Sequence, residues 1–286
     1  MRHPILVPVG LVAALALAAC DKEIDKDAVD RKLQDINVID ESDLNEVMLS
    51  SSDPNEAVNY FRRATASKPD RIDLQRGLAL SLIRAKRPTE AVSIWKKVTE
   101  MEGTTPADSV ELADAYIRND QWDKAEETLD AIPPTHETFK RYRLEAMIAD
   151  ANEEWKKADS FYETAVGLTT QPAGVMNNWG YSKLTRGDYS GAEKLFVQAI
   201  RQDSSLFTAK NNLVLARGAQ GRYTLPVVPM TQQERAELLY TMGLSAVKRG
   251  DPETGKGLFR DAIETHPQYF EAAVRSLRAL EENVAN

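Results

Sequence analysis

The 286-residue chain contains one cysteine and three histidines. A single cysteine excludes an intramolecular disulfide framework and any zinc site built from several thiolates. The histidines, His3, His136 and His266, are far apart in sequence, and none has a second histidine or a cysteine at the spacing of a metal site. We therefore expect no metal centre.

Positive charge and catalytic signatures are also scarce. The formal net charge of −8 argues against a nucleic-acid binder held by phosphate contacts. The sequence has no G-x-S-x-G, Gly-rich phosphate loop or H-E-x-x-H motif, and no nucleophile with a matching base. Gly255 and Gly257 follow no strand pattern, so they are not a dinucleotide signature. We expect a protein that is not an enzyme and that needs no cofactor.

The start of the chain has the pattern of a targeting segment. Arg2 is followed by an uncharged, mostly apolar stretch from Ile5 to Ala19. This stretch is shorter than the roughly 20 residues that span a bilayer, but it fits the apolar core of a secretory signal. Its end, Leu17-Ala18-Ala19-Cys20, resembles the lipobox of bacterial lipoproteins. In that family the chain is cut before the cysteine, which carries acyl chains on its sulfur and its new amino group.

The resemblance predicts a signal peptide over residues 1–19 and a lipid anchor at Cys20. Two or more acyl chains hold a protein stably at a membrane. The alternative is an ordinary signal peptide with a chance cysteine. Asp21 resembles an inner-membrane retention signal of enteric lipoproteins, a rule that varies among bacteria. We expect a protein of the cell envelope that faces the periplasm, with the choice of membrane left open.

Acidic residues follow the cysteine. Residues 21–56 contain twelve Asp or Glu and four Lys or Arg, a net charge of −8. Segments with high charge and few aromatics bury too little apolar surface to order themselves. We therefore predict a flexible acidic tether over residues 20–39, counted from the lipidated cysteine. A solvated helix face is an alternative from about Asp40 onward.

An internal repeat organises the rest of the chain. A small residue, a large apolar residue four positions later and a small or apolar one seven positions later recur from Ala57, Ala91, Ala125, Ala158 and Ala192. A related segment begins at Gly255. The nearly constant period, about 34 residues, and the pattern resemble the tetratricopeptide repeat, in which each unit is a pair of antiparallel helices.

The resemblance implies an all-α fold, a right-handed α-solenoid of helix pairs over residues 40–284. Stacked pairs bury a continuous core and leave a concave side. Small residues should let paired helices approach closely, as at Ala79, Gly180 and Gly243 on the first helices. We expect the large residues of the second helices to be core residues: Phe61, Trp95, Leu129, Tyr162, Phe196 and Phe259.

One repeat departs from the pattern. The small position expected one period after Ala192 is Pro226, and Pro229 follows soon after. Proline in a helix interior removes a hydrogen bond and clashes with the preceding turn. We predict an extended loop near residues 224–231 in place of a second helix. Thr231, with Glu234 three positions on, is the expected start of the next helix.

The repeat register also predicts which side chains face the concave groove. Amide, aromatic and cationic groups at these positions can bind the backbone or the end of a peptide. The predicted groove residues are Arg76, Arg84, Arg118, Arg143, Asn177, Asn178, Tyr181, Asn211, Asn212, Tyr240 and Lys248. The alternative is that they are solvated, with the asparagines bracing neighbouring helices. Arg186 is expected to be exposed at a helix turn, and Lys194 and Gln198 to lie on the convex side.

A narrower resemblance concerns function. The lipobox, "SDPNEAVNYFRRA", "NNWGYSKLTRGDYSGAEKLFVQAI", "AKNNLVLARGAQGRY" and the late proline break resemble the repeat lipoproteins of the tight-adherence (Flp) pilus system, the TadD family. That resemblance implies a scaffold or pilotin-like factor whose partners are the pilus secretin or assembly components. The alternatives are a type IV pilus or other envelope-assembly lipoprotein, and an adaptor of the peptidoglycan machinery.

Overall fold

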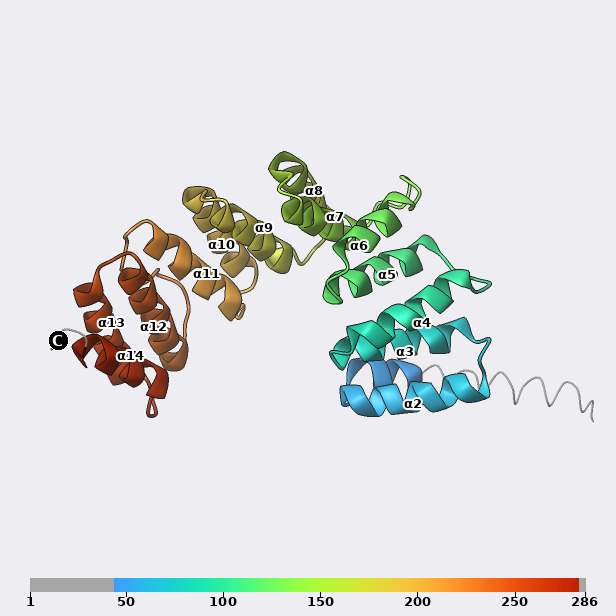
Figure 1. Cartoon of the computed structure of the whole chain (residues 1–286), viewed down its shortest axis with the longest axis horizontal. Helices are drawn as coiled ribbons and strands as arrows, with labels where there is room; N and C mark the ends of the chain where they lie inside the picture. The colour runs from blue at the N-terminus through green and yellow to red at the C-terminus, as the bar shows by residue number, and fades with distance from the viewer. Residues whose placement is uncertain (1–43, 283–286) are drawn as a thin grey trace, which may run out of the picture.

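The computed structural model describes residues 44–282 of the chain, and these residues are helical with no strand among them. A short helix over residues 44–50 comes first. The helices that follow are α2 (Pro54–Ser67), α3 (Ile72–Arg84), α4 (Pro88–Glu100), α5 (Pro106–Arg118), α6 (Trp122–Asp130), α7 (Phe139–Ala151), α8 (Trp155–Gly167), α9 (Ala173–Thr185), α10 (Tyr189–Gln202), α11 (Phe207–Ala219), α12 (Gln232–Lys248), α13 (Pro252–Thr265) and α14 (Glu271–Glu282). Figure 1 shows the helix pairs following one another along an arch.

Local sequence explains where the helices begin. Asp53, Asp188 and Asp251 accept hydrogen bonds from backbone N–H groups in the first turns of α2, α10 and α13. Side-chain caps of this kind satisfy donors that have no partner inside the helix. Proline stands in the first turn of α2, α4, α5 and α13, where its missing N–H costs nothing.

From α3 onward, the turn that follows the first helix of a repeat has a recurring backbone conformation. One residue per turn has a positive φ: Lys86, Asp120, Glu153, Gly187, Gly221 and Gly250. Glycine adopts this conformation freely, whereas a side chain makes it costly. Gly221 lies one repeat period after Gly187. The repeat that contains Pro226 therefore keeps the usual turn after its first helix, although its second helix is missing.

Large side chains packed against small ones form the core. Phe61, Trp95, Leu129, Tyr162, Phe196 and Phe259 are all buried, which confirms the core prediction. A Cβ on Gly180 would lie 2.6 Å from Cε1 of Phe196, and one on Gly243 would lie 2.6 Å from Cε1 of Phe259. Gly77 of α3 makes a similarly close contact with Phe61, which belongs to the preceding helix α2. Small residues at these positions therefore allow neighbouring helices to pack closely.

An irregular segment over residues 220–231 replaces the second helix of one repeat, as predicted. Helix α11 packs directly on α12, and Gly218 allows this because a Cβ there would clash with Ser245. Thr231 and Glu234 form the predicted capping box at the start of α12. Glu234 also pairs with the buried Lys210 of α11, with Nζ and Oε1 2.9 Å apart.

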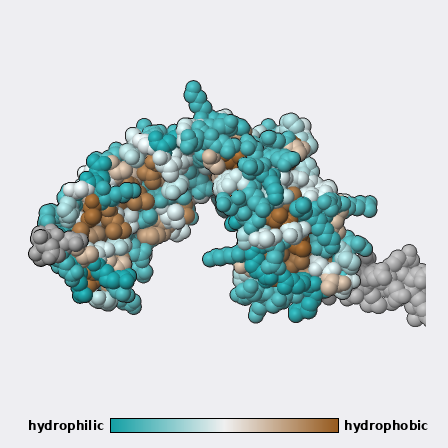
Figure 2. Space-filling model, viewed as in Figure 1, coloured by the Kyte–Doolittle hydropathy of each residue, from teal (hydrophilic) through white to brown (hydrophobic). Residues whose placement is uncertain are grey.

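The first helices of neighbouring repeats lie next to one another, as α5 does with α7 and α9 with α11. We call the side of the solenoid that they form the inner face. Figure 2 shows that hydrophilic residues cover most of the visible surface, with hydrophobic patches between them.

The predicted all-helical solenoid is confirmed for the described residues. The signal peptide over residues 1–19, the tether over residues 20–39 and the anchor at Cys20 lie outside them.

Candidate partner-binding groove

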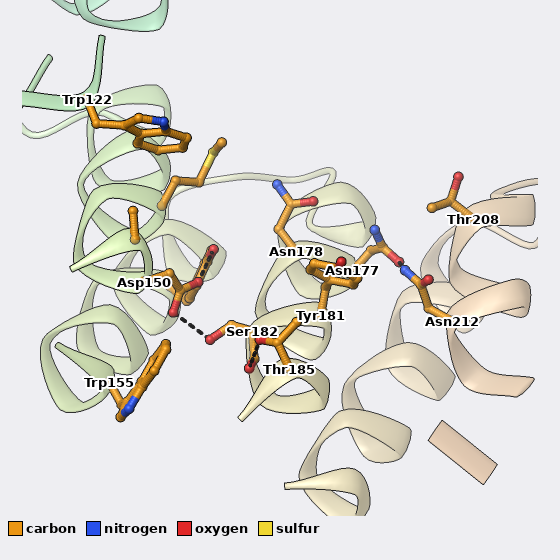
Figure 3. Close-up of a pocket in the computed structure, with 13 residues that line it drawn as sticks. Trp122, Asp150, Trp155, Asn177, Asn178, Tyr181, Ser182, Thr185, Thr208 and Asn212 are labelled. Atoms are coloured by element: carbon orange, nitrogen blue, oxygen red, sulfur yellow. Dashed lines mark hydrogen bonds between the residues drawn. The ribbon is translucent and has the colours of Figure 1, made fainter. Parts of the chain in front are cut away.

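The inner face contains a pocket of about 530 Å³, which we call the central pocket. Its walls come from the starts of α6 and α8 and from the first helices α7, α9 and α11. Figure 3 shows Trp122, Asp150 and Trp155 on one side of it and the asparagines of α9 and α11 across from them. The lining residues are Trp122, Met147, Asp150, Ala151, Trp155, Tyr162, Asn177, Asn178, Tyr181, Ser182, Thr185, Thr208 and Asn212.

Three hydrogen bonds connect side chains that line this pocket. The amide of Asn212 donates to Oδ1 of Asn177 at 3.0 Å, and both residues are buried. Asp150 accepts from the hydroxyl of Tyr162 at 2.8 Å and from that of Ser182 at 2.6 Å. These bonds connect α7, α8, α9 and α11, so they fix the relative positions of three repeats.

Burial raises the pKa of the Asp150 carboxyl above its ordinary value, even though Ser182 and Tyr162 donate hydrogen bonds that favour the ionised form. Burial and the neighbouring Asp150 charge also raise the pKa of Tyr162. Tyr162 therefore stays protonated and remains a hydrogen-bond donor. Among the described residues, no ion pair engages Asp150.

A second pocket of about 530 Å³ adjoins the first, and we call it the C-terminal pocket. Tyr181 and Thr185 line both pockets. The floor of the C-terminal pocket is apolar and its far end is basic. Its lining residues are Tyr181, Leu184, Thr185, Tyr189, Leu215, Ala219, Thr241, Leu244, Ser245, Lys248 and Arg249. The two pockets form one groove with Tyr181, 53% exposed, standing between them.

Five of the predicted groove residues lie in this groove. Asn177, Asn178, Tyr181 and Asn212 line the central pocket, and Lys248 lines the C-terminal one. Two others do not. Asn211 accepts a hydrogen bond from Thr241 of α12 at 2.9 Å. Tyr240 packs between Phe259 and Phe270, with its hydroxyl 3.3 Å from that of Ser276.

The four predicted arginines lie outside both pockets, and most have partners within the chain. Arg76 forms a bidentate pair with Asp108, with Nε and Oδ1 2.6 Å apart. Arg84 donates to the carbonyl groups of Met48 and Ser52. Arg118 pairs with Asp114 at 3.1 Å, and Arg143 lies over the Phe139 ring.

Sequence reasoning missed the aromatic walls. Trp122, Trp155 and Tyr189 are the first residues of three successive second helices, α6, α8 and α10. Each stands three positions before the repeat alanine, where α2, α4 and α13 have proline. This substitution at a fixed repeat position was the signal that could have found them.

The expectation that Arg186 is exposed is wrong. Its side chain is only 12% exposed, and Nη2 lies 2.5 Å from Oδ1 of Asp159. The guanidinium also lies over the Trp155 ring, 5.7 Å from the centroid. Trp155, at the start of α8, and Asp159 therefore hold the Arg186 side chain against the protein and reduce its exposure. Lys194 and Gln198 of α10, which the register placed on the convex side, are exposed.

Residues 44–282 contain no group of three or more His, Cys, Asp or Glu that could hold a metal ion. No helix in this part of the chain has both the length and the apolar character needed to cross a bilayer.

Three family models of the tetratricopeptide repeat match the chain, over residues 82–148, 49–97 and 237–269. These segments are tetratricopeptide repeats. The matched segment 82–148 ends within α7, which pairs with α8, and residues 149–236 contain the same kind of helix pair in α9 with α10. No curated protein matches the chain.

Solved structures show the same fold at low sequence identity. A chain of the APC/C hetero-tetramer Cut9-Hcn1 matches with 12% identity and a TM-score of 0.60 over 82% of this chain and 48% of that one. The present chain thus spans about half of its length. A tetratricopeptide repeat protein from Parabacteroides merdae matches with 13% identity and a TM-score of 0.56, over 84% and 96%. Human IFIT1 with PPP-AAAA matches with 13% identity and a TM-score of 0.54, over 81% and 59%.

Proposed function

We propose that the protein is a non-catalytic scaffold, anchored by lipid at Cys20 and facing the periplasm, whose groove binds a segment of an envelope-assembly protein. The observation that supports binding is the pair of adjoining pockets on the inner face, joined at the exposed Tyr181. Stacked helical repeats create extended concave surfaces of this kind, and such surfaces typically hold other proteins.

The groove has the features of a peptide site rather than a reaction site. Half of its lining residues are aromatic or aliphatic, and polar groups such as Asp150 and Asn212 are held in place by hydrogen bonds within the chain, as in sites that orient a bound segment. An aromatic side chain that projects between two pockets is a typical energetic centre of a protein interface. Tyr181 is therefore the residue on which we expect affinity to depend most.

The proposed partners are the secretin or the assembly components of a tight-adherence (Flp) pilus. This proposal rests on the resemblance to the repeat lipoproteins of that system, and on the lipobox-like Leu17-Ala18-Ala19-Cys20. A lipid anchor would concentrate the scaffold at the membrane where such machines are built. Replacing Cys20 with Ser should release the protein from carbonate-washed membranes and prevent incorporation of labelled palmitate.

The binding proposal is tested with the full chain in detergent, titrated with purified periplasmic domains of the pilus secretin and assembly proteins. We expect Tyr181→Ala to weaken binding about thirtyfold, the equivalent of about 2 kcal/mol. Lys194→Ala, on the exposed surface of α10, is the matched control and should bind as the wild type does. Equal affinity of Tyr181→Ala and wild type would contradict recognition in this groove.

A further inference from the structure

The central pocket carries a negative charge, although several of the residues predicted for the groove are arginines. Asp150 is the one charged residue among those that line it. The other walls are the aromatic residues Trp122, Trp155, Tyr162 and Tyr181, together with amides, hydroxyls and Met147. The pocket is therefore aromatic and negative, and none of its lining residues supplies a balancing cation.

The carboxylate of Asp150 keeps hydrogen-bonding capacity for a ligand. Each of its oxygens accepts one bond, from Tyr162 and from Ser182. A carboxylate offers about four acceptor positions, so about two remain. The basic side chains on the adjoining turn pair elsewhere: Arg186 and Lys183 both engage Asp159.

The aromatic walls are suited to a cation. A guanidinium or ammonium group is attracted to the face of a Trp or Tyr ring within about 6 Å of its centroid. Trp155 already binds a guanidinium in this way, because Arg186 lies 5.7 Å from its ring centroid. Trp122 and Tyr181 line the same pocket, and Tyr181 is more than half exposed.

We propose that the central pocket receives a lysine or arginine side chain of the bound protein segment. This inference rests on the proposed function, since it assumes that the occupant of the groove is a protein. The cation pairs with Asp150, and its alkyl part packs against Trp122, Trp155 and Tyr181. The C-terminal pocket next to it, floored by Leu184, Leu215 and Leu244, takes an apolar side chain from the same segment.

A saccharide is the other ligand class that aromatic walls and polar groups can hold, and the structure favours it less. A neutral sugar would bring no cation to the Asp150 carboxylate, which the nearby Arg186 attracts without forming an ion pair, since Arg186 pairs with Asp159. The buried amides of Asn177 and Asn212 bond to each other, so they are not directed at hydroxyl groups of a ligand. Charge complementarity thus favours a basic peptide.

The test uses the full chain in detergent and short peptides selected on it from a random display library. For a selected peptide, each basic residue is replaced by a neutral side chain of similar shape, citrulline for arginine and norleucine for lysine. We expect the peptides to share a basic residue and its replacement to weaken binding about tenfold or more. On Asp150→Asn the same replacement should change affinity less than about twofold, because the partner charge is already absent.

Asp261→Asn, an exposed carboxylate on α13, is the control and should behave as wild type. Trp122→Leu leaves every charge in place, and it should weaken the basic peptide more than its neutral analogue. Hydrogen exchange of α7 to α9 verifies that the variants keep their fold.

Two results would overturn the inference in distinguishable ways. Peptides that need Tyr181 but contain no important basic residue would remove the cation pocket and leave the proposed function standing. Absence of any Tyr181-dependent peptide, or chito-oligosaccharides that bind the groove in place of peptides, would remove both.

Discussion

Two regions of the inner face, one near α3 and α5 and one from α7 to α12, follow the same repeat register. Inward side chains of the first region are bonded within the chain, whereas those of the second line pockets. In the first region Arg76 and Arg84 bond to neighbouring parts of the chain, and neither lines a pocket. In the second, Tyr181 and Asp150 stand beside pockets large enough for side chains. A shared backbone geometry therefore does not give a shared surface chemistry.

The difference comes from what the next repeat offers. Arg76 meets Asp108, an acidic residue in the first turn of α5 that also closes a capping box with Thr105. The central pocket, by contrast, is bordered by aromatic residues at the starts of α6 and α8. An inward arginine links two repeats when an acidic residue lies opposite it. An inward tyrosine without such a partner remains accessible to a ligand.

The largest expected effect tests whether the two regions share one core. Phe61→Ala and Phe196→Ala should each cost about 3–5 kcal/mol, because both rings are fully buried against a glycine of an adjacent helix. Urea unfolding with hydrogen exchange measures the loss and shows where it lies. A much smaller loss for either variant would show that the repeats do not pack alike.

Next in size is the loss of the tie that characterises the first region. Arg76→Ala should cost about 1–3 kcal/mol, since it leaves the carboxylate of Asp108, only 5% exposed, without its cation. Because the Arg76 side chain is partly exposed, solvent screening keeps the effect in this range. Partner affinity should not change. The urea midpoint measures the first quantity, and titration measures the second.

Low pH should change the stability contributions of Asp108 in the first region and Asp150 in the second in opposite directions. Burial alone would raise the pKa of Asp108, but hydrogen bonds from Arg76 and Thr105 outweigh it and lower this pKa below 3.8. The stability that ionised Asp108 contributes is therefore present above pH 3.8 and is lost as the pH falls through the lowered value. The pKa of Asp150 is raised by burial, so its effect has the opposite sign: its charge costs stability above the raised pKa, and protonation removes that cost.

Urea unfolding between about pH 7 and about pH 3 measures both effects against Asp108→Asn and Asp150→Asn. The advantage of the wild type over Asp108→Asn should shrink at the acid end. Relative to Asp150→Asn, the wild type should gain stability as the pH falls. Parallel pH curves for a variant and the wild type would contradict the corresponding assignment.

The smallest expected effect is on the stability of Tyr181→Ala. An exposed side chain away from the core contributes within about 0.5 kcal/mol, so this variant should unfold with the wild type while its partner binding is lost. Circular dichroism during urea titration measures the first quantity. A large destabilisation would mean that Tyr181 supports the fold and that its effect on binding is indirect.

Much of the fold could be predicted because the same residue types recur at the same positions of successive repeats, so the sequence indicates each kind of contact several times. The buried aromatics, the small residues facing them and the capping box at Thr231 and Glu234 all follow from one alignment. The site was only partly predictable. The register indicated which helix face points inward, and it correctly included Asn178 and Tyr181 among the pocket-lining residues.

Pairing across repeats could not be predicted, because it depends on distances between side chains that are far apart in the sequence. Arg76 and Asp108 are 32 positions apart, and Lys210 and Glu234 are 24 apart. Nor could the register distinguish Asn211 from Asn212. Adjacent residues on a helix differ by about 100° in direction, and that rotation turns Asn212 toward Asn177 and Asn211 toward Thr241.

The direct seating of α11 on α12 has a consequence for cooperativity. In a one-dimensional array, stability passes from unit to unit through nearest-neighbour interfaces. Here one unit lacks its second helix, and α11 is coupled to α12 by the buried Val214, the Gly218 contact, the Lys210–Glu234 pair and the bond from Arg249 to the Ala219 carbonyl. Substitutions that weaken these links, such as Lys210→Met, should let α12 to α14 melt as a separate phase. The solenoid would then behave as two thermodynamic blocks, with the partner groove lying across their junction and a bound segment coupling them.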